Sequence, residues 1–173
     1  YRHALALDPR FAPAHGNLGA ALQAQGRLDE AEASYRRAIA LKPDYARAHG
    51  NLGAVLQERH RFTDAEASFR KVLQLQPKSA EAHCNLGTLM MRQGRLDEAE
   101  ACHRRALALQ PNRAETLSNL GATLCQLGRF EESEDCLRNA LALKPDDSDS
   151  LIRLGITLKG LGRATEAEGT ALQ

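Results

Sequence analysis

Apolar and polar positions recur along this 173-residue chain with a fixed period. Within each period, apolar residues spaced three and four positions apart predict two amphipathic helices. In the first full period, this spacing predicts one helix from about Pro13 to Gln25 and a second from about Leu28 to Leu41. Gly26 lies between them, at a position where a left-handed backbone suits glycine. The period is therefore a helix–turn–helix unit.

Five prolines define the length of the period. Pro9, Pro43, Pro77, Pro111 and Pro145 each lie 34 residues from the next. A fixed period of this size is typical of a solenoid, in which each unit packs against its neighbours. We predict a single array over residues 1–173. Its segments are the second helix of a truncated unit at 1–11, full units at 12–45, 46–79, 80–113 and 114–147, and a partial fifth unit at 148–173.

Spaced residues within the unit resemble the motif of the tetratricopeptide repeat. The motif reads His15-x-x-Leu18-Gly19-x-x-Leu22, then Ala31-x-x-x-Tyr35, then Pro43. The resemblance covers essentially the whole chain, and it implies an all-α solenoid, a right-handed superhelix of helix–turn–helix units that binds a protein partner. The chain departs from the family at the column where tryptophan is usual, which holds His15, His49, His83, Leu117 and Leu151.

One face of each predicted first helix is small and neutral, although solvent exposure alone would favour charged residues there. In the first unit this face includes Gly16 and Asn17. Asparagine recurs on it, each time directly before a leucine–glycine pair, as Asn17, Asn51, Asn85 and Asn119. In tetratricopeptide proteins the first helix lines the concave wall, so the resemblance implies a ladder of asparagines along a groove. The repeats are also similar to those of the O-linked N-acetylglucosamine transferases, in which such asparagines hold a peptide backbone.

A side-chain amide donates and accepts hydrogen bonds, so an asparagine ladder suits a peptide backbone whatever the side chains of the peptide. The alternative is that the amides bond neighbouring helices or water and hold the stacking angle. Selectivity would come from flanking charges that differ between units, among them Arg47, Glu81 and Arg92. Arg153 replaces asparagine in the fifth unit, so we predict that the groove changes character there.

Composition argues against several classes of partner. Lys and Arg number 23 against 22 Asp and Glu, a net charge of +1, so nothing favours nucleic acid. No apolar run is long enough to insert into a membrane. The cysteines lack the spacing of a zinc site and read as reduced thiols of a cytoplasmic protein. They are Cys84, Cys102, Cys125 and Cys136.

No catalytic motif is present, so we predict that this chain is not itself an enzyme and needs no cofactor. His15, His49 and His83 lie one to a unit on the packing face, too far apart to share a metal ion. We expect them to be structural, partly buried and hydrogen-bonded. His60 stands where the other units have glycine between their helices. If the turn keeps its geometry, this histidine is left-handed.

Both ends of the array carry apolar positions without a partner unit. The chain opens inside a repeat at Tyr1, so we expect that further sequence precedes it in the native protein. Unpaired apolar faces favour end-to-end self-association. The main prediction is a protein–protein interaction scaffold that binds an extended peptide in a concave groove. The alternatives are a substrate-recruiting region of a larger glycosyltransferase, similar to the O-linked N-acetylglucosamine transferases, and a self-assembling scaffold.

Overall fold

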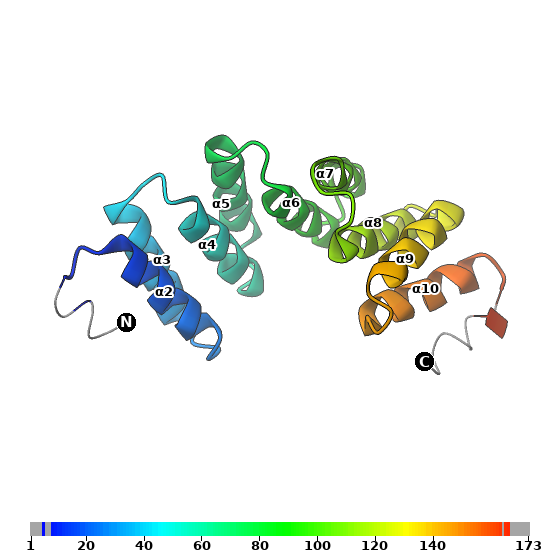
Figure 1. The fold of residues 1–173 in the computed structure, drawn as a ribbon, viewed down its shortest axis with the longest axis horizontal. Coiled ribbons are helices and arrows are strands. Elements are labelled where there is room, and N and C mark those ends of the chain that lie inside the picture. Colours follow the sequence, from blue (N-terminus) through cyan, green and yellow to red (C-terminus); the bar gives the residue numbers. More distant parts are fainter. Residues whose placement is uncertain (1–4, 6–7, 164, 167–173) are drawn as a thin grey trace. The chain divides into compact units, whose positions relative to one another are not determined.

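A computed structural model describes residues 5, 8–163 and 165–166, which form helices joined by short turns (Figure 1). Within this part of the chain no strand occurs, and the fold is an all-α solenoid of helix pairs, as the sequence predicts. The helices are α2 (Ala12–Gln23), α3 (Leu28–Leu41), α4 (Ala46–Glu58), α5 (Phe62–Leu75), α6 (Ala80–Arg92), α7 (Leu96–Leu109), α8 (Ala114–Gln126), α9 (Phe130–Leu143) and α10 (Ser148–Gly160).

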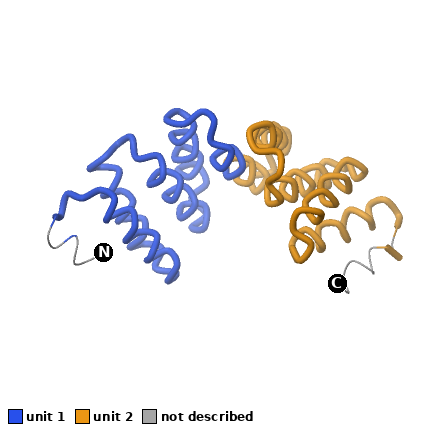
Figure 2. Tube along the Cα trace, viewed as in Figure 1, with its two compact units in different colours: residues 1–85 blue, residues 86–173 orange. Residues whose placement is uncertain are grey.

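The chain divides into two compact units (Figure 2). Unit 1 spans residues 1–85 and holds α2 to α5 with the beginning of α6. Unit 2 spans residues 86–173 and holds the end of α6 with α7 to α10. The helix predicted at the N-terminal end, in residues 1–11, lies largely outside the described residues. The proposed fifth unit is described only as far as residue 166.

The turn between the two helices of a repeat has one left-handed residue. Gly26 has a φ of 71°, and the N–H of Arg27 then reaches back to the carbonyl of Leu22 at 3.0 Å. This hydrogen bond closes α2 at Gln23, two residues before the predicted end, whereas the predicted bounds of α3 are confirmed. His60 has a φ of 58°, which confirms its predicted left-handed backbone. Its ring meets Phe62 edge-on, with 5.7 Å between centroids.

Glycine on the first helix of a pair allows the second helix to pack closely. A methyl group built on Gly19 would lie 2.7 Å from Cε1 of Tyr35, and one on Gly53 would lie 2.6 Å from Cε1 of Phe69. Both rings are therefore laid directly against a helix backbone, and both are buried. Burying an aromatic side chain of this size contributes roughly 1.5–3 kcal/mol. The repeated glycine column is thus a requirement of packing.

The repeated histidines are structural, as predicted. Nε2 of His15 lies 3.0 Å from the carbonyl oxygen of Pro9, and Nε2 of His49 lies 2.9 Å from that of Pro43. Because a carbonyl only accepts, this ring nitrogen carries the proton and donates. Both side chains are half-buried. Each histidine thereby ties a first helix to the loop that precedes it.

At Arg61, Arg129 and Arg163, the arginine after the left-handed residue joins two consecutive second helices, an arrangement we call the arginine clasp. In unit 1, Arg61 pairs with Asp64 on its own helix and reaches Glu32 of α3, with 2.7 Å from Nη1 to Oε1. In unit 2, Arg129 pairs with Glu132 and with Glu100 in the same way. Burial alone would raise the pKa of Glu100, but hydrogen bonds from Arg104 and Arg129 outweigh it and lower the pKa. The Glu100 carboxylate is therefore held charged.

Asp147 caps the N-terminus of α10, and its loss should weaken that helix. Its carboxylate accepts from the hydroxyl of Ser150 at 2.6 Å, from the N–H of Ser150 at 3.0 Å and from Nζ of Lys144 at 2.9 Å. The Ser150 hydroxyl and then Lys144 lower the pKa of Asp147 to about 2. We expect Asp147→Ala to cost about 1 kcal/mol of unfolding free energy at neutral pH.

A carboxylate whose pKa is lower in the folded state than in the unfolded state stabilises the fold at pH values above its unfolded pKa. This contribution is lost as the pH falls through the folded-state pKa. The difference between wild type and Asp147→Ala should therefore shrink as pH falls from about 4 to about 2. Urea unfolding at several pH values measures it. A difference that stayed constant down to pH values of about 2 would contradict a charge-dependent cap.

Candidate functional site

Unit 1 contains a groove of about 270 Å³ between α4 and α6, with α5 at its floor. Phe69 and Val72 of α5 form the apolar base. The two walls hold most of the site residues that the sequence predicts in the second and third full repeats. These wall residues are Arg47, Gly50 and Asn51 on α4, with Glu81, Ala82 and Asn85 on α6. The structure thus brings two of the four predicted asparagines into one groove.

Small residues keep this groove open. A methyl group on Gly50 would meet only Cγ2 of Val72, at 3.8 Å, so the wall of α4 has room beside it. Ala46, Val72 and Ala82 pack together beneath the walls and hold α4, α5 and α6 in place. Charged residues of opposite sign, Arg47 and Glu81, are exposed at the two rims. The groove therefore has an apolar base, polar walls and a rim that differs in charge from side to side.

The two asparagines of the groove differ in their contacts. Asn51 hydrogen-bonds the hydroxyl of Tyr35, which also donates to Oε1 of Gln23 at 3.1 Å. Burial raises the pKa of Tyr35, and the bond from Asn51 opposes that rise. Asn85 is half-buried and lines the groove, and its side chain makes no hydrogen bond within residues 8–163. The Asn85 amide is therefore an open polar group in the wall of this groove.

Asn17 contacts the groove through Arg47. Nη2 of Arg47 donates to Oδ1 of Asn17 at 2.8 Å and to the hydroxyl of Tyr45 at 2.6 Å, with its guanidinium 5.6 Å from the centre of the Tyr45 ring. The same ring covers Gly16, where an added methyl group would lie 3.1 Å from its Cε1. Gly16 is therefore buried by Tyr45, the last residue of the same repeat, although it shares a face of α2 with Asn17.

In unit 2 the corresponding residues pair with one another. Oδ1 of Asn119 accepts from Nη1 of Arg153 at 2.9 Å, and its Nδ2 donates to Oγ1 of Thr88 at 3.2 Å. Arg153 also donates to Oγ of Ser118 at 2.8 Å. Asn119 is buried. Arg92, the remaining candidate, is exposed in the last turn of α6, which belongs to unit 2.

Sequence reasoning missed Tyr45 and Gln76 at this site. Gln76 and Ser79 line the groove from the turn between α5 and α6. Tyr45 occupies the same place one repeat earlier as Ser79, directly before a first helix. The sequence signal for Tyr45 was its aromatic ring, because the same position of the later repeats holds the polar residues Ser79, Arg113 and Asp147. It points to a position that packs on one neighbour and orients an adjacent arginine.

Metal binding and membrane insertion find no support in the part of the chain that the structure describes. There, no three His, Cys, Asp or Glu side chains gather closely enough to hold a metal ion. No helix in residues 8–163 has both the length and the apolar character to cross a membrane. Burial raises the pKa of the Cys136 thiol, so that thiol stays protonated at neutral pH.

The helix pairs and their motif define a tetratricopeptide repeat protein. A family model described as tetratricopeptide repeat matches residues 10–78, 44–112, 78–146 and 112–173. The chain therefore belongs to this family. No curated protein sequence matches it significantly.

Solved structures share the fold at low sequence identity. PilW, described as a widely conserved type IV pilus biogenesis factor, is 28% identical with a TM-score of 0.91, covering 99% of this chain and 80% of PilW. YrrB, described as a tetratricopeptide protein with an unusual peptide-binding site, is 22% identical with a TM-score of 0.76, covering 99% and 90%. PilF of Pseudomonas aeruginosa is 23% identical with a TM-score of 0.83, covering 92% and 72%.

Proposed function

We propose that this protein is an interaction scaffold that holds an extended peptide segment in the groove of unit 1. Asn51 and Asn85 would bond the peptide backbone, while Arg47 and Glu81 would select for side chains at the rims. The observation that carries the proposal is the half-buried Asn85 amide, which lines the groove and has no partner among the described residues. The Asn85 amide is accessible from the groove, so it can donate to and accept from a peptide group that lies there.

The spacing of the walls suits a peptide backbone. Packed helices lie about 8–10 Å apart, and an extended chain rises about 3.1–3.4 Å per residue. Every third peptide group would then meet one asparagine. An amide supplies both donors and an acceptor, so it can pair with N–H and C=O of the same peptide. Affinity would come from the backbone, and selectivity from the opposite charges of Arg47 and Glu81 at the rims.

The remaining candidate residues have supporting roles in this proposal. Asn17 orients Arg47 at the rim through the bond between them. Asn119 would join the ladder only after it releases Arg153. Arg92 and Arg153 would act at the rim of unit 2. Binding would therefore begin in unit 1, where the amides are more available.

Replacing Asn51 and Asn85 together with alanine should weaken peptide binding about tenfold to hundredfold. The double variant loses two to four hydrogen bonds, each worth about 0.5–1.5 kcal/mol. The probe is a peptide selected on the wild-type protein from a random displayed library, and calorimetry gives its affinity. Asn139→Ala, at an exposed position of α9, is the matched control. Unchanged affinity in a normally helical double variant would contradict the proposal.

Recruitment of substrates for a larger glycosyltransferase would use the same groove. That hypothesis needs a catalytic domain outside the 173 residues of this chain. The scaffold needs only the groove that Asn51, Asn85, Arg47 and Glu81 form. We therefore propose the scaffold as the function, with catalysis by a neighbouring domain as an addition to it.

Self-association is a second candidate role, favoured by exposed apolar residues on α10. Ile152 and Ile156 lie one helical turn apart and are 63% and 56% exposed. An apolar strip of this kind favours contact with another protein surface. We expect Ile152→Ser with Ile156→Ser to reduce any association seen by sedimentation over a concentration series. Leu143→Ser, at an exposed apolar residue of α9, is the control. Wild-type protein that stays monomeric at every concentration would exclude this role.

A further inference from the structure

A second groove lies in unit 1 between α3 and α5, with α4 at its floor. Its volume is about 500 Å³. The base is apolar, formed by Ile39 and Ala40 of α3, Leu52 of α4 and Ala67 of α5. At about 100° per residue, Leu52 lies across α4 from Gly50, which lines the groove between α4 and α6. The two grooves therefore open on different faces of unit 1.

The charged residues that line this groove are basic. Arg36 borders it from α3 and Lys71 from α5, and no carboxylate lines it. Arg36 pairs with Glu32 while its side chain remains 52% exposed, so it can still meet a ligand. The Lys71 amine has no ion-pair partner within the described residues. His49 also lines the groove, but its Nε2 is already bonded to the carbonyl of Pro43.

The same positions two periods later have different chemistry. Asn139 stands in place of Lys71, and Asp135 stands in place of Ala67. Leu117 stands in place of His49. Since α7, α8 and α9 form helix pairs like those of unit 1 without these residues, repeat packing does not require a lysine at position 71. One period later both border positions are again basic, as Arg70 and Arg105, so the basic border is shared with the next repeat and loses its second charge at Asn139.

We propose that the α3–α5 groove binds an acidic peptide segment that carries one apolar side chain. The apolar side chain would lie on Ile39, Leu52 and Ala67, and flanking carboxylates would pair with Arg36 and Lys71. Charge complementarity of this kind raises the association rate and rejects basic partners. This site goes beyond the asparagine groove, because it lies on another face of α4 and uses none of the same residues.

The probe is a fluorescein-labelled peptide with leucine flanked on each side by two glutamates. Fluorescence anisotropy should show binding of this peptide by the whole chain. The same peptide with lysine for glutamate should not bind. Affinity for the acidic peptide should fall as sodium chloride rises from about 50 mM to about 500 mM, because salt screens exposed charges. Equal binding of both peptides would overturn the proposal.

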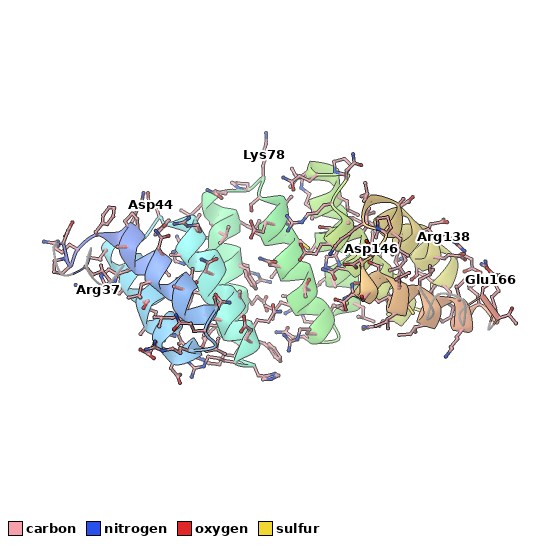
Figure 3. All side chains as sticks on the ribbon, turned by 60° about the horizontal axis from the view of Figure 1, so that its bottom comes forward. Arg37, Asp44, Lys78, Arg138, Asp146 and Glu166 are labelled. Carbon is pink, nitrogen blue, oxygen red and sulfur yellow. The ribbon has the colours of Figure 1, made fainter. Side chains whose placement is uncertain are left out.

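Two pairs of variants separate this groove from the rest of the surface. Lys71→Glu should weaken binding about tenfold, because it replaces an attractive border charge with a repulsive one. Lys78→Glu makes the same charge change in the loop between α5 and α6, where Lys78 points away from the helices (Figure 3), and should have no effect. Ala40→Trp fills the groove from an exposed position and should abolish binding. Ala108→Trp, the equivalent change on α7, should not.

Other occupants give different results in the same experiment. A second copy of the chain in the groove would make Ala40→Trp change the sedimentation of the protein without any peptide binding, which overturns the proposal. Binding to anionic vesicles but not to the acidic peptide would overturn it as well. The Asn51→Ala and Asn85→Ala double variant should bind the acidic peptide normally. That result supports an independent site, and it distinguishes failure of this proposal from failure of the asparagine groove.

Discussion

Replacing Gly53 with alanine is expected to lower the free energy of unfolding by about 2 kcal/mol. The new methyl group would lie 2.6 Å from Cε1 and 2.8 Å from Cδ1 of Phe69. Phe69 is fully buried, and its ring already packs against the backbone of Gly53. Alanine favours a helix over glycine by about 1 kcal/mol, but forcing atoms into a packed interior costs up to about 3 kcal/mol or more. The steric cost therefore exceeds the gain in helix propensity.

Gly50→Ala is the matched control for this experiment, since it lies one turn earlier on the same helix. Its methyl group would sit 3.8 Å from Cγ2 of Val72, an ordinary contact. We expect Gly50→Ala to raise the unfolding free energy by about 0.5–1 kcal/mol, the helix propensity alone. Urea unfolding followed by circular dichroism measures both variants. Equal effects of the two substitutions would show that close packing against Phe69 is not what maintains glycine in this column.

Removing the carboxylate of Glu32 is expected to destabilise the chain by about 2 kcal/mol. The Glu32 side chain is 3% exposed and pairs with Arg36, Arg59 and Arg61. Glu32→Ala would leave these cations close together without their shared anion. Breaking a fully buried pair costs about 3–5 kcal/mol, but the three arginine side chains are between 31% and 52% exposed. Because water can solvate them, the expected cost is smaller.

Glu30→Ala provides the comparison for Glu32. Glu30 is 54% exposed and pairs with Arg27 on the surface of the same repeat. Exposed ion pairs contribute about 0–1 kcal/mol, so its loss should be slight. Unfolding in added salt should reduce the Glu30 effect more than the Glu32 effect, since buried charges are screened less. If Glu32→Ala cost no more than Glu30→Ala, the clasp between repeats would be dispensable for stability.

Most of the fold could be predicted from the sequence because equivalent positions can be compared between repeats. The period, the bounds of α3 and the left-handed backbone of His60 all followed from comparing columns. The structural role of His15 and His49 followed as well. A single helix pair would not have shown that His60 occupies a glycine position. Local preferences and period agree in this chain, which is why sequence reasoning worked at this level.

The candidate site could be predicted only in part. Sequence reasoning found Asn51 and Asn85, whose position on the helix face follows from the helical period. It treated Asn119 as equivalent. In the structure, however, the Asn119 amide already accepts a hydrogen bond from Arg153 and donates one to Thr88. The identity of a neighbour one repeat away determines which asparagine is open. Such a contact depends on long side chains whose direction the period does not set.

The sequence by itself determined the helix pairs, the turn residues and the glycine columns, because these follow from backbone preference and from spacing along one helix. Only the tertiary structure decided what the repeated positions contact. Tyr45 buries Gly16, and Arg61 reaches Glu32 of the preceding second helix. These contacts join residues about one period apart, and they depend on side-chain rotamers and on which neighbour competes for the same space. Identical positions in the repeat therefore become different surfaces.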